Sequence, residues 1–156
     1  MGQVYLAGGT VSTSAGWERD GDTCVVRRAM RLDARLARGG VLPPPMRHLS
    51  VSALVECPLT LMARLRTAFR ERVSQLSLVG EGSFAFADGH EGRYLCLEME
   101  LLPGMRSRQL HVVRSDAGVT RHFVATVSGM DSSALDAELR PMIGSFRLAA
   151  TSAAAV

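Results

Sequence analysis

Two pairs of side chains in this sequence have the types and spacing for chemistry. Cys96 and His111 are expected to face each other on neighbouring strands, where an imidazole could take the proton of a thiol. Glu98 and Glu100 share one face at strand spacing, as a general acid and base could. The sequence offers Cys96 and His111 no orienting third group and no oxyanion donor. We therefore interpret Cys96 as a small, partly buried residue beside a hydrogen-bonded imidazole. We interpret the glutamates as exposed acidic residues that balance the charge of Arg121 across the sheet.

Metal and nucleotide sites are not indicated either. His111 and His122 lie on neighbouring predicted strands, but the register derived below points them to opposite faces. The segment 88–92, Asp-Gly-His-Glu-Gly, holds three potential ligands in a composition that is ordinary for a hairpin loop. No phosphate-binding, dinucleotide-binding, metalloprotease or nucleophile-elbow motif occurs. We expect no catalytic residue, no cofactor and no metal, so that the chain is not an enzyme.

The length and composition are those of one globular domain. The 156 residues can bury their own core, and we place the domain at residues 1–150 and a disordered tail at 151–156. No apolar run approaches the roughly 18 to 20 residues that cross a bilayer, so no stable membrane insertion is expected. The first ten residues lack the basic and apolar regions of a secretion signal, which predicts a cytoplasmic location.

The basic residues and the cysteines carry little functional signal. The 18 basic residues are all arginine, they are scattered, and aromatic residues are only 5%, which argues against nucleic-acid binding. Cys24, Cys57 and Cys96 are an odd number without a CxxC spacing, so we expect free thiols.

The chemistry-bearing residues depend on a set of strands and two helices. The most secure helix begins at Pro58, because apolar residues then recur at three- and four-residue steps as far as Leu76. Before this helix we expect two short strands within Val4–Val26, a proline-rich loop over 27–46 and a strand at His48–Glu56. After it we expect a strand at Leu76–Ala87 and an antiparallel meander of three strands, Tyr94–Leu102, Met105–Arg114 and Val119–Val127. A Ser133–Asp136 capping box begins a short helix over Leu135–Ile143, and the closing segment Ser145–Leu148 docks or pairs. We predict an α+β fold: an antiparallel sheet of about five to seven strands, with the long and the short helix packed on one face.

The first hairpin of the meander predicts one pair of facing residues. Pro103-Gly104 reads as a two-residue loop, which pairs Leu102 with Met105. Counting back along both strands then sets Cys96 opposite His111.

The second hairpin leaves two alternatives. If Gly118 supplies the left-handed position of a three-residue loop, Val112 faces His122. A two-residue loop would demand a positive φ at Ala117, where a side chain is strained, so we expect the three-residue loop.

This register divides the meander into two faces. One is apolar and is expected to lie under the helices: Leu95, Leu97, Met99, Leu101, Leu110, Val112 and Val124. The other mixes apolar and hydrogen-bonding side chains and is expected to be free for a partner: Tyr94, Cys96, Glu98, Gln109, His111, Val113, Arg121, Phe123 and Ala125.

The order of these features resembles the DcrB-like domains of the PsbP-like fold. The residues that carry the resemblance are Tyr5, Gly9 and the Gly16-Trp17 corner, the strand-to-helix step over Leu49–Leu76, Gly92-Arg93-Tyr94 at the entry to the meander, Gln109 in its middle strand, and Ile143-Gly144-Ser145-Phe146-Arg147 near the end. The match covers most of the chain. It departs from the family at 27–46, which is longer and richer in proline.

Members of that family without a signal peptide resemble cytoplasmic chaperones of type VI secretion effectors. The resemblance implies a protein, often a homodimer, that shields the hydrophobic N-terminal helices of a toxin and keeps it soluble for loading. The mixed face, with Tyr94, Val113 and Phe123 as apolar area and Gln109, His111 and Arg121 as donors, could receive such a helix. The alternatives are a DcrB-like domain that binds a small molecule or serves a stress-related role without a secreted client, and an enzyme that uses Cys96 and His111.

Overall fold

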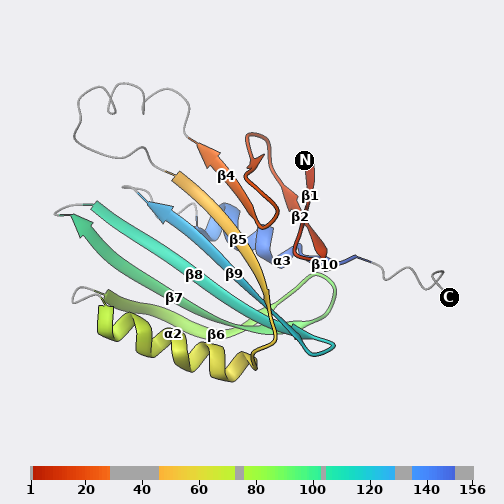
Figure 1. The fold of residues 1–156 in the computed structure, drawn as a ribbon. Coiled ribbons are helices and arrows are strands. Elements are labelled where there is room, and N and C mark those ends of the chain that lie inside the picture. The colour runs from red at the N-terminus through yellow and green to blue at the C-terminus, as the bar shows by residue number, and fades with distance from the viewer. Residues whose placement is uncertain (1, 29–45, 73–75, 103–104, 129–134, 150–156) are drawn as a thin grey trace.

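The computed structural model describes residues 2–28, 46–72, 76–102, 105–128 and 135–149. They form two antiparallel sheets and two helical segments, an α+β arrangement as predicted (Figure 1). The large sheet has the order β3-β4-β5-β9-β8-β7-β6, and its strands are β3 (Glu18–Arg19), β4 (Cys24–Arg28), β5 (Met46–Leu54), β6 (Leu76–Ala85), β7 (Glu91–Leu102), β8 (Met105–Asp116) and β9 (Val119–Ser128).

The N-terminal residues form more strands than the sequence predicts. β1 (Gly2–Leu6) and β2 (Gly9–Thr13) make a hairpin, and β10 (Arg147–Leu148) pairs with β2, as expected for the closing segment. The turn between β1 and β2 is Ala7-Gly8, both with positive φ (49° and 83°), which suits a two-residue hairpin loop. β3 and β4 then join the large sheet, so the region holds four short strands where two were expected.

The long helix α2 (Pro58–Arg72) begins at Pro58 as predicted, because the first turn of a helix tolerates a missing N–H donor. Its buried Leu61 and Met62 pack against Leu95, Leu97 and Val113 of the large sheet. We call this side of the sheet the α2 face.

The short helical segment lies on the opposite side of the sheet, which we call the α3 face (Figure 1). A π-helical turn, η1 (Leu135–Leu139), runs into α3 (Arg140–Gly144), and both pack with the small sheet over Cys96, Leu110 and Val112. The expectation that both helices cover one face is therefore wrong. Successive strand residues point to opposite sides, and both sides of this sheet carry apolar rows that need covering.

The core of the α3 face is built around aromatic rings and one buried arginine. Phe123 is fully buried, with its ring centroid 5.6 Å from that of Phe86 and 5.0 Å from that of Phe146. Arg114 is 1% exposed, and its guanidinium lies 4.6 Å from the Phe86 ring centre and 5.1 Å from that of Phe146. Cation–π contacts of this kind hold the charged group within the aromatic cluster.

A bulge changes the predicted register of the first hairpin. Leu102 pairs with Met105 as expected, but the pairing shifts by one residue between Glu100 and Leu102. The extra residue, Leu101, sets Cys96 opposite Leu110 instead of His111.

The second hairpin has the loop that the sequence disfavours. Asp116 pairs with Val119, so the loop is the two residues Ala117 and Gly118, with φ of 50° and 80°. Val112 consequently faces Phe123, where His122 was expected. The gain from matching the twist of the two strands outweighs the cost of a positive φ at an alanine.

Three predictions fall wholly or partly outside the described residues. Of the predicted loop 27–46, residues 27 and 28 belong to β4 and Met46 begins β5, while 29–45 lie outside. The same holds for Ser133 of the proposed capping box and for the tail at 151–156.

Candidate binding face

Beyond the part that α2 covers, the α2 face continues over β8, β9 and β5. The α2 helix packs against Leu95 and Leu97 of β7 and Val113 of β8, and in Figure 1 no described helix lies over β9 and β5 on this side of the sheet. Six side chains at its centre, which we call the open patch, are mostly half-buried, with His111 more deeply set: Gln109, His111, His122, Val124, Thr126 and Ser50.

The open patch is uncharged at neutral pH. All the side chains that the structure describes on this face of β8, β9 and β5 are hydroxyl, amide, imidazole or apolar groups. They are Ser107, Gln109, His111, Val113 and Ser115 on β8, Thr120, His122, Val124 and Thr126 on β9, and His48, Ser50, Ser52 and Leu54 on β5. Among the described side chains, acidic and basic groups on these three strands are confined to the α3 face.

Two histidines and a glutamine form a row across the patch. The Nδ1 of His111 lies 2.9 Å from the Nε2 of His122, and the two rings are stacked with centroids 5.2 Å apart. The Nε2 of His111 lies 3.2 Å from the Oε1 of Gln109. The prediction that His111 and His122 point to opposite faces is wrong, because the two-residue turn at Ala117 places them side by side.

Both imidazoles are neutral. Burial, with a smaller effect of His122, lowers the pKa of His111 to about 3. Burial and the positive charge of Arg64 on α2 lower the pKa of His122 to about 4. The row therefore offers hydrogen bonds without charge.

The cysteine that meets an imidazole is Cys24. Its Sγ lies 2.7 Å from the Nε2 of His48, on the same face at β4 and β5. Burial and the nearby Asp20 raise the pKa of the Cys24 thiol, and burial lowers the pKa of His48 despite the opposing effect of Asp20. Both groups are neutral, so this pair lacks the thiolate that a nucleophile needs. The predicted pair of Cys96 and His111 does not form, because the two side chains lie on opposite faces.

The eight predicted partner-binding residues do not share one face. Gln109, His111 and Val113, all from β8, lie on the α2 face, and Val113 is covered by α2. The other five lie on the α3 face: Tyr94, Cys96, Glu98, Arg121 and Phe123. The face that was expected to be free is thus the one that η1, α3 and the small sheet cover.

The predicted residues on the α3 face have structural contacts. Tyr94 packs over Gly80 and Gly82 of the edge strand β6, with the Arg140 guanidinium 4.9 Å from its ring centre. The Nε of Arg121 donates a 2.9 Å hydrogen bond to the backbone oxygen of Ala7 and so ties the two sheets together. Glu98 was expected to answer Arg121. It instead accepts hydrogen bonds from Arg106 and Arg108, at 3.2 and 2.6 Å.

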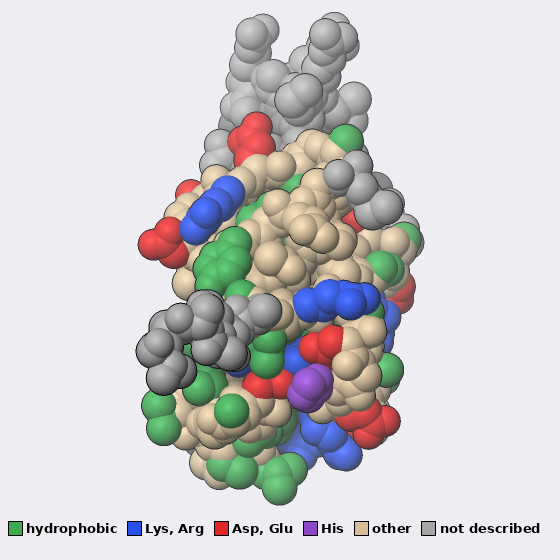
Figure 2. Space-filling model, turned by 90° about the vertical axis from the view of Figure 1, so that its right-hand side faces the viewer, with side chains coloured by type: hydrophobic (Ala, Val, Ile, Leu, Met, Phe, Trp, Pro, Cys, Tyr) green, Lys and Arg blue, Asp and Glu red, His purple; other side chains and the backbone are tan. Residues whose placement is uncertain are grey.

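The loop at 88–92 completes an ionic cluster on the α3 face. Arg114 donates to both oxygens of Asp116 at 2.8 Å, and to Asp88 at 2.9 and 3.2 Å. The exposed His90 lies 3.1 Å from an oxygen of Asp116. Figure 2 shows acidic, basic and histidine side chains lying together on the side of the molecule where these turns lie. Among the described residues, no group of three or more His, Cys, Asp or Glu side chains could hold a metal ion.

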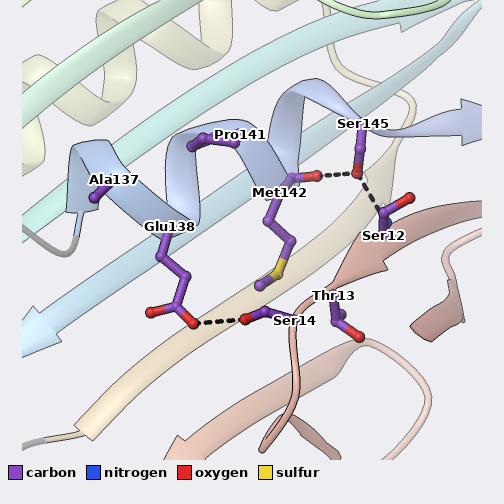
Figure 3. A pocket seen from close by; sticks show the side chains of 8 residues that line it. All are labelled: Ser12, Thr13, Ser14, Ala137, Glu138, Pro141, Met142 and Ser145. Atoms are coloured by element: carbon purple, nitrogen blue, oxygen red, sulfur yellow. Dashed lines mark hydrogen bonds between the residues drawn. The ribbon is translucent and has the colours of Figure 1, made fainter. Parts of the chain in front are cut away.

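A pocket of about 420 Å³ lies between β2 and the η1–α3 segment (Figure 3). Its wall is rich in hydroxyl groups: Ser12, Thr13, Ser14, Ala137, Glu138, Pro141, Met142 and Ser145. The Oγ of Ser145 accepts a hydrogen bond from the backbone N–H of Ser12 and donates one to the Met142 carbonyl. Glu138 accepts hydrogen bonds from the Ser14 hydroxyl and from the indole of Trp17.

Comparisons with known proteins show the fold alone. No family model and no curated protein matches the sequence. The structure is similar to that of PA94 from Pseudomonas aeruginosa, a protein of unknown function described as a candidate regulator, with a TM-score of 0.54 and 12% identity over 97% of this chain and 99% of that chain. The solution structure of the cyanobacterial PsbP (CyanoP) from Synechocystis sp. PCC 6803 matches with a TM-score of 0.49 and 13% identity over 95% of this chain and 92% of that chain.

Two smaller findings concern the cysteines and the helices. Cys24, Cys57 and Cys96 are free, as predicted. No helix among the described residues has the length and apolarity to cross a membrane.

Proposed function

We propose that this chain is a non-catalytic chaperone or adaptor that holds an apolar helix of a partner protein against the open patch. The partner that fits the resemblance of the sequence is a type VI secretion effector with hydrophobic N-terminal helices. A cytoplasmic location and a homodimer, which go with that resemblance, belong to the same proposal.

The observation that carries the proposal is the chemistry of the open patch. Moving an apolar helix from water onto neutral side chains costs little free energy of desolvation. An unpaired charge in the contact would instead have to be desolvated at a cost of several kcal/mol. Val124 provides apolar area at the centre of the patch, and Thr126, Ser50, His122 and Gln109 surround it with hydrogen-bonding groups. Small polar residues of a client helix would find partners there.

The position of α2 gives the guest helix a neighbour. A helix laid on β9 and β5 would run beside α2, where helix axes pack about 8 to 10 Å apart. Leu54 and Leu65, both partly buried, line the border between α2 and this part of the sheet. The guest would therefore contact both a sheet and a helix, which is the kind of surface that helix-in-groove recognition uses.

Co-expression with a candidate client tests the proposal. The client is the product of the neighbouring reading frame, if its first segment is apolar and helical, and its soluble yield is measured with and without this chain. We expect Val124→Asp to abolish the gain in soluble client, because it places a charge in the patch. Ser83→Asp, an exposed position on β6, is the matched control and should leave the gain unchanged.

Two outcomes contradict the proposal. One is a client yield that does not depend on this chain, and the other is full activity of the Val124→Asp variant with normal folding by circular dichroism.

The pocket between β2 and α3 favours a second candidate, a domain that binds a small molecule. Its volume of about 420 Å³ lies within the range of small-molecule sites, roughly 300 to 1,000 Å³. It ranks second because Ser145 and Glu138 already hydrogen-bond to neighbouring groups. A ligand in this pocket should be displaced by Ala137→Trp, which leaves the open patch untouched, and a ligand whose affinity is unchanged in that variant binds elsewhere.

A further inference from the structure

The row of Gln109, His111 and His122 has a direction, which follows from its hydrogen bonds. The Oε1 of Gln109 can only accept, so the Nε2 of His111, 3.2 Å away, carries the proton and donates. A neutral imidazole has a single N–H, which leaves the Nδ1 of His111 as an acceptor. The Nε2 of His122, 2.9 Å from that nitrogen, must then be the donor. His122 is left with an unprotonated Nδ1.

The two ends of the row have no partner among the described residues. Both His122 and Gln109 are half-buried on the open patch. No described group hydrogen-bonds to the Nδ1 of His122 or to the amide nitrogen of Gln109. One end is therefore an acceptor and the other a donor, and a guest that displaces water from them must replace both hydrogen bonds.

A helix can satisfy the two ends only in different ways. Its backbone N–H groups are used within the helix, so a donor for His122 has to be a side chain. Its carbonyl oxygens have a second lone pair, so any helix can accept from the Gln109 amide. Discrimination between helices should arise at His122.

We propose, on the basis of the function proposed above, that the open patch selects a client helix with a serine, threonine or other small side-chain donor placed opposite His122. The row of three residues is then a specificity determinant: the Gln109 amide can donate to a backbone carbonyl of any helix, whereas the acceptor nitrogen of His122 is left unsatisfied by a wholly apolar one. His111 positions the other two residues, because it donates to Gln109 and accepts from His122. These two hydrogen bonds fix the tautomers of His111 and His122.

Nitrogen-15 NMR tests the direction of the row without any partner. Two-bond correlations at neutral pH should show both His111 and His122 as the tautomer protonated at Nε2 only. A Nδ1–H tautomer at either residue, or a protonated ring, overturns the inference.

Two model helices test the selection. One is an alanine-leucine helix of about twenty residues with a serine at its centre, and the other is the same helix with alanine there. We expect the serine helix to bind roughly three- to tenfold more tightly, the effect of one hydrogen bond. Equal affinities overturn this inference but leave the proposed function standing, whereas failure of both helices to bind overturns the proposed function and this inference with it.

Variants of His122 separate recognition from folding. His122→Phe keeps the ring but has no acceptor, and should bind both helices equally. His122→Gln keeps a donor for His111 and an acceptor for the guest, so it should retain the preference for serine. If His122→Phe does not fold, loss of the preference in His122→Gln becomes the result that overturns the inference.

Discussion

The two faces of the large sheet treat polar groups in opposite ways. On the α3 face, Arg114 is 1% exposed and sits between Asp88, Asp116 and two phenylalanine rings. On the open patch the polar groups are neutral and, apart from the buried His111, half-exposed. A face that is covered by its own chain can hold charges, because each partner is built in. A face that is proposed to receive a guest does better without charges, because a guest rarely brings matched counter-charges to every position.

The largest effect is expected from breaking the ionic cluster on the α3 face. Arg114→Met should lower the free energy of unfolding by about 3 kcal/mol, because the buried Asp116 and the partly buried Asp88 lose the guanidinium that they share, and only Arg121, 3.5 Å from Asp116, remains. Urea denaturation measures it, with Arg93→Met, an exposed arginine on β7, as the control. A loss below about 1 kcal/mol would mean that the cluster is open to water.

Truncation of neighbouring residues on β8 and β9 sharpens the contrast. Leu110→Ala should cost about 2 to 5 kcal/mol, because Leu110 is fully buried on the α3 face. Val124→Ala, half-buried on the open patch, should cost about 1 kcal/mol or less. Thermal or urea unfolding of the two variants checks the difference, and equal losses would show that the patch is sealed.

The histidines of the patch should make stability depend on pH. Their folded-state pKa values, about 3 for His111 and about 4 for His122, lie below the ordinary value of 6.5. The unfolded chain therefore binds protons first, so stability is complete above about pH 6.5 and falls as the pH drops towards 4. Each histidine contributes at most roughly 1.4 kcal/mol per pH unit between its unfolded and folded pKa, and the range is wider for His111 than for His122.

Urea midpoints measured between about pH 7 and 5 check this prediction. His111→Gln should remove roughly half of the slope, because His122 titrates over the same range in the unfolded chain. The acidic cluster contributes only at lower pH, because the hydrogen bonds from Arg114 hold the pKa of Asp116 below its usual range. A slope that is unchanged in His111→Gln would assign the effect to other groups.

The smallest effect concerns the turn that decides which residues reach the patch. Ala117 has a φ of 50°, which asparagine tolerates better than alanine. Ala117→Asn should raise the free energy of unfolding by roughly 0.5 to 1 kcal/mol, whereas Ala117→Val should lower it. A destabilising effect of asparagine would argue against the two-residue loop.

The sequence predicts the elements of this fold far better than their pairing. Apolar periodicity after Pro58 locates α2, and runs of β-forming residues separated by Gly, Pro and Asp locate β6 to β9. These signals are local, and the sequence pattern of a strand is the same whatever its neighbour and its register. The closing strand at Arg147–Leu148 also follows from the sequence.

The register depends on two features that leave no such signal. The bulge at Leu101 and the positive φ at Ala117 each move the pairing by one residue, which turns a strand over. The two shifts cancel at β9, so the faces predicted for β7 and β9 are consistent with each other. The β8 residues were assigned to the wrong face relative to β7: Gln109, Leu110, His111, Val112 and Val113. The neutral state of the histidines depends on burial and could not be read from residue type.

The pairing of β10 with β2 has a consequence for synthesis. The hydrogen bond from the N–H of Ser12 to the Oγ of Ser145 joins residues 133 positions apart. Strand β2 of the N-terminal hairpin therefore has no partner on its second edge until β10 has left the ribosome. β5 to β9 and α2 are all translated earlier. The strands and the helix of the α2 face can therefore come together before β10 exists, whereas the small sheet on the α3 face gains its third strand only after Arg147 and Leu148 have been added.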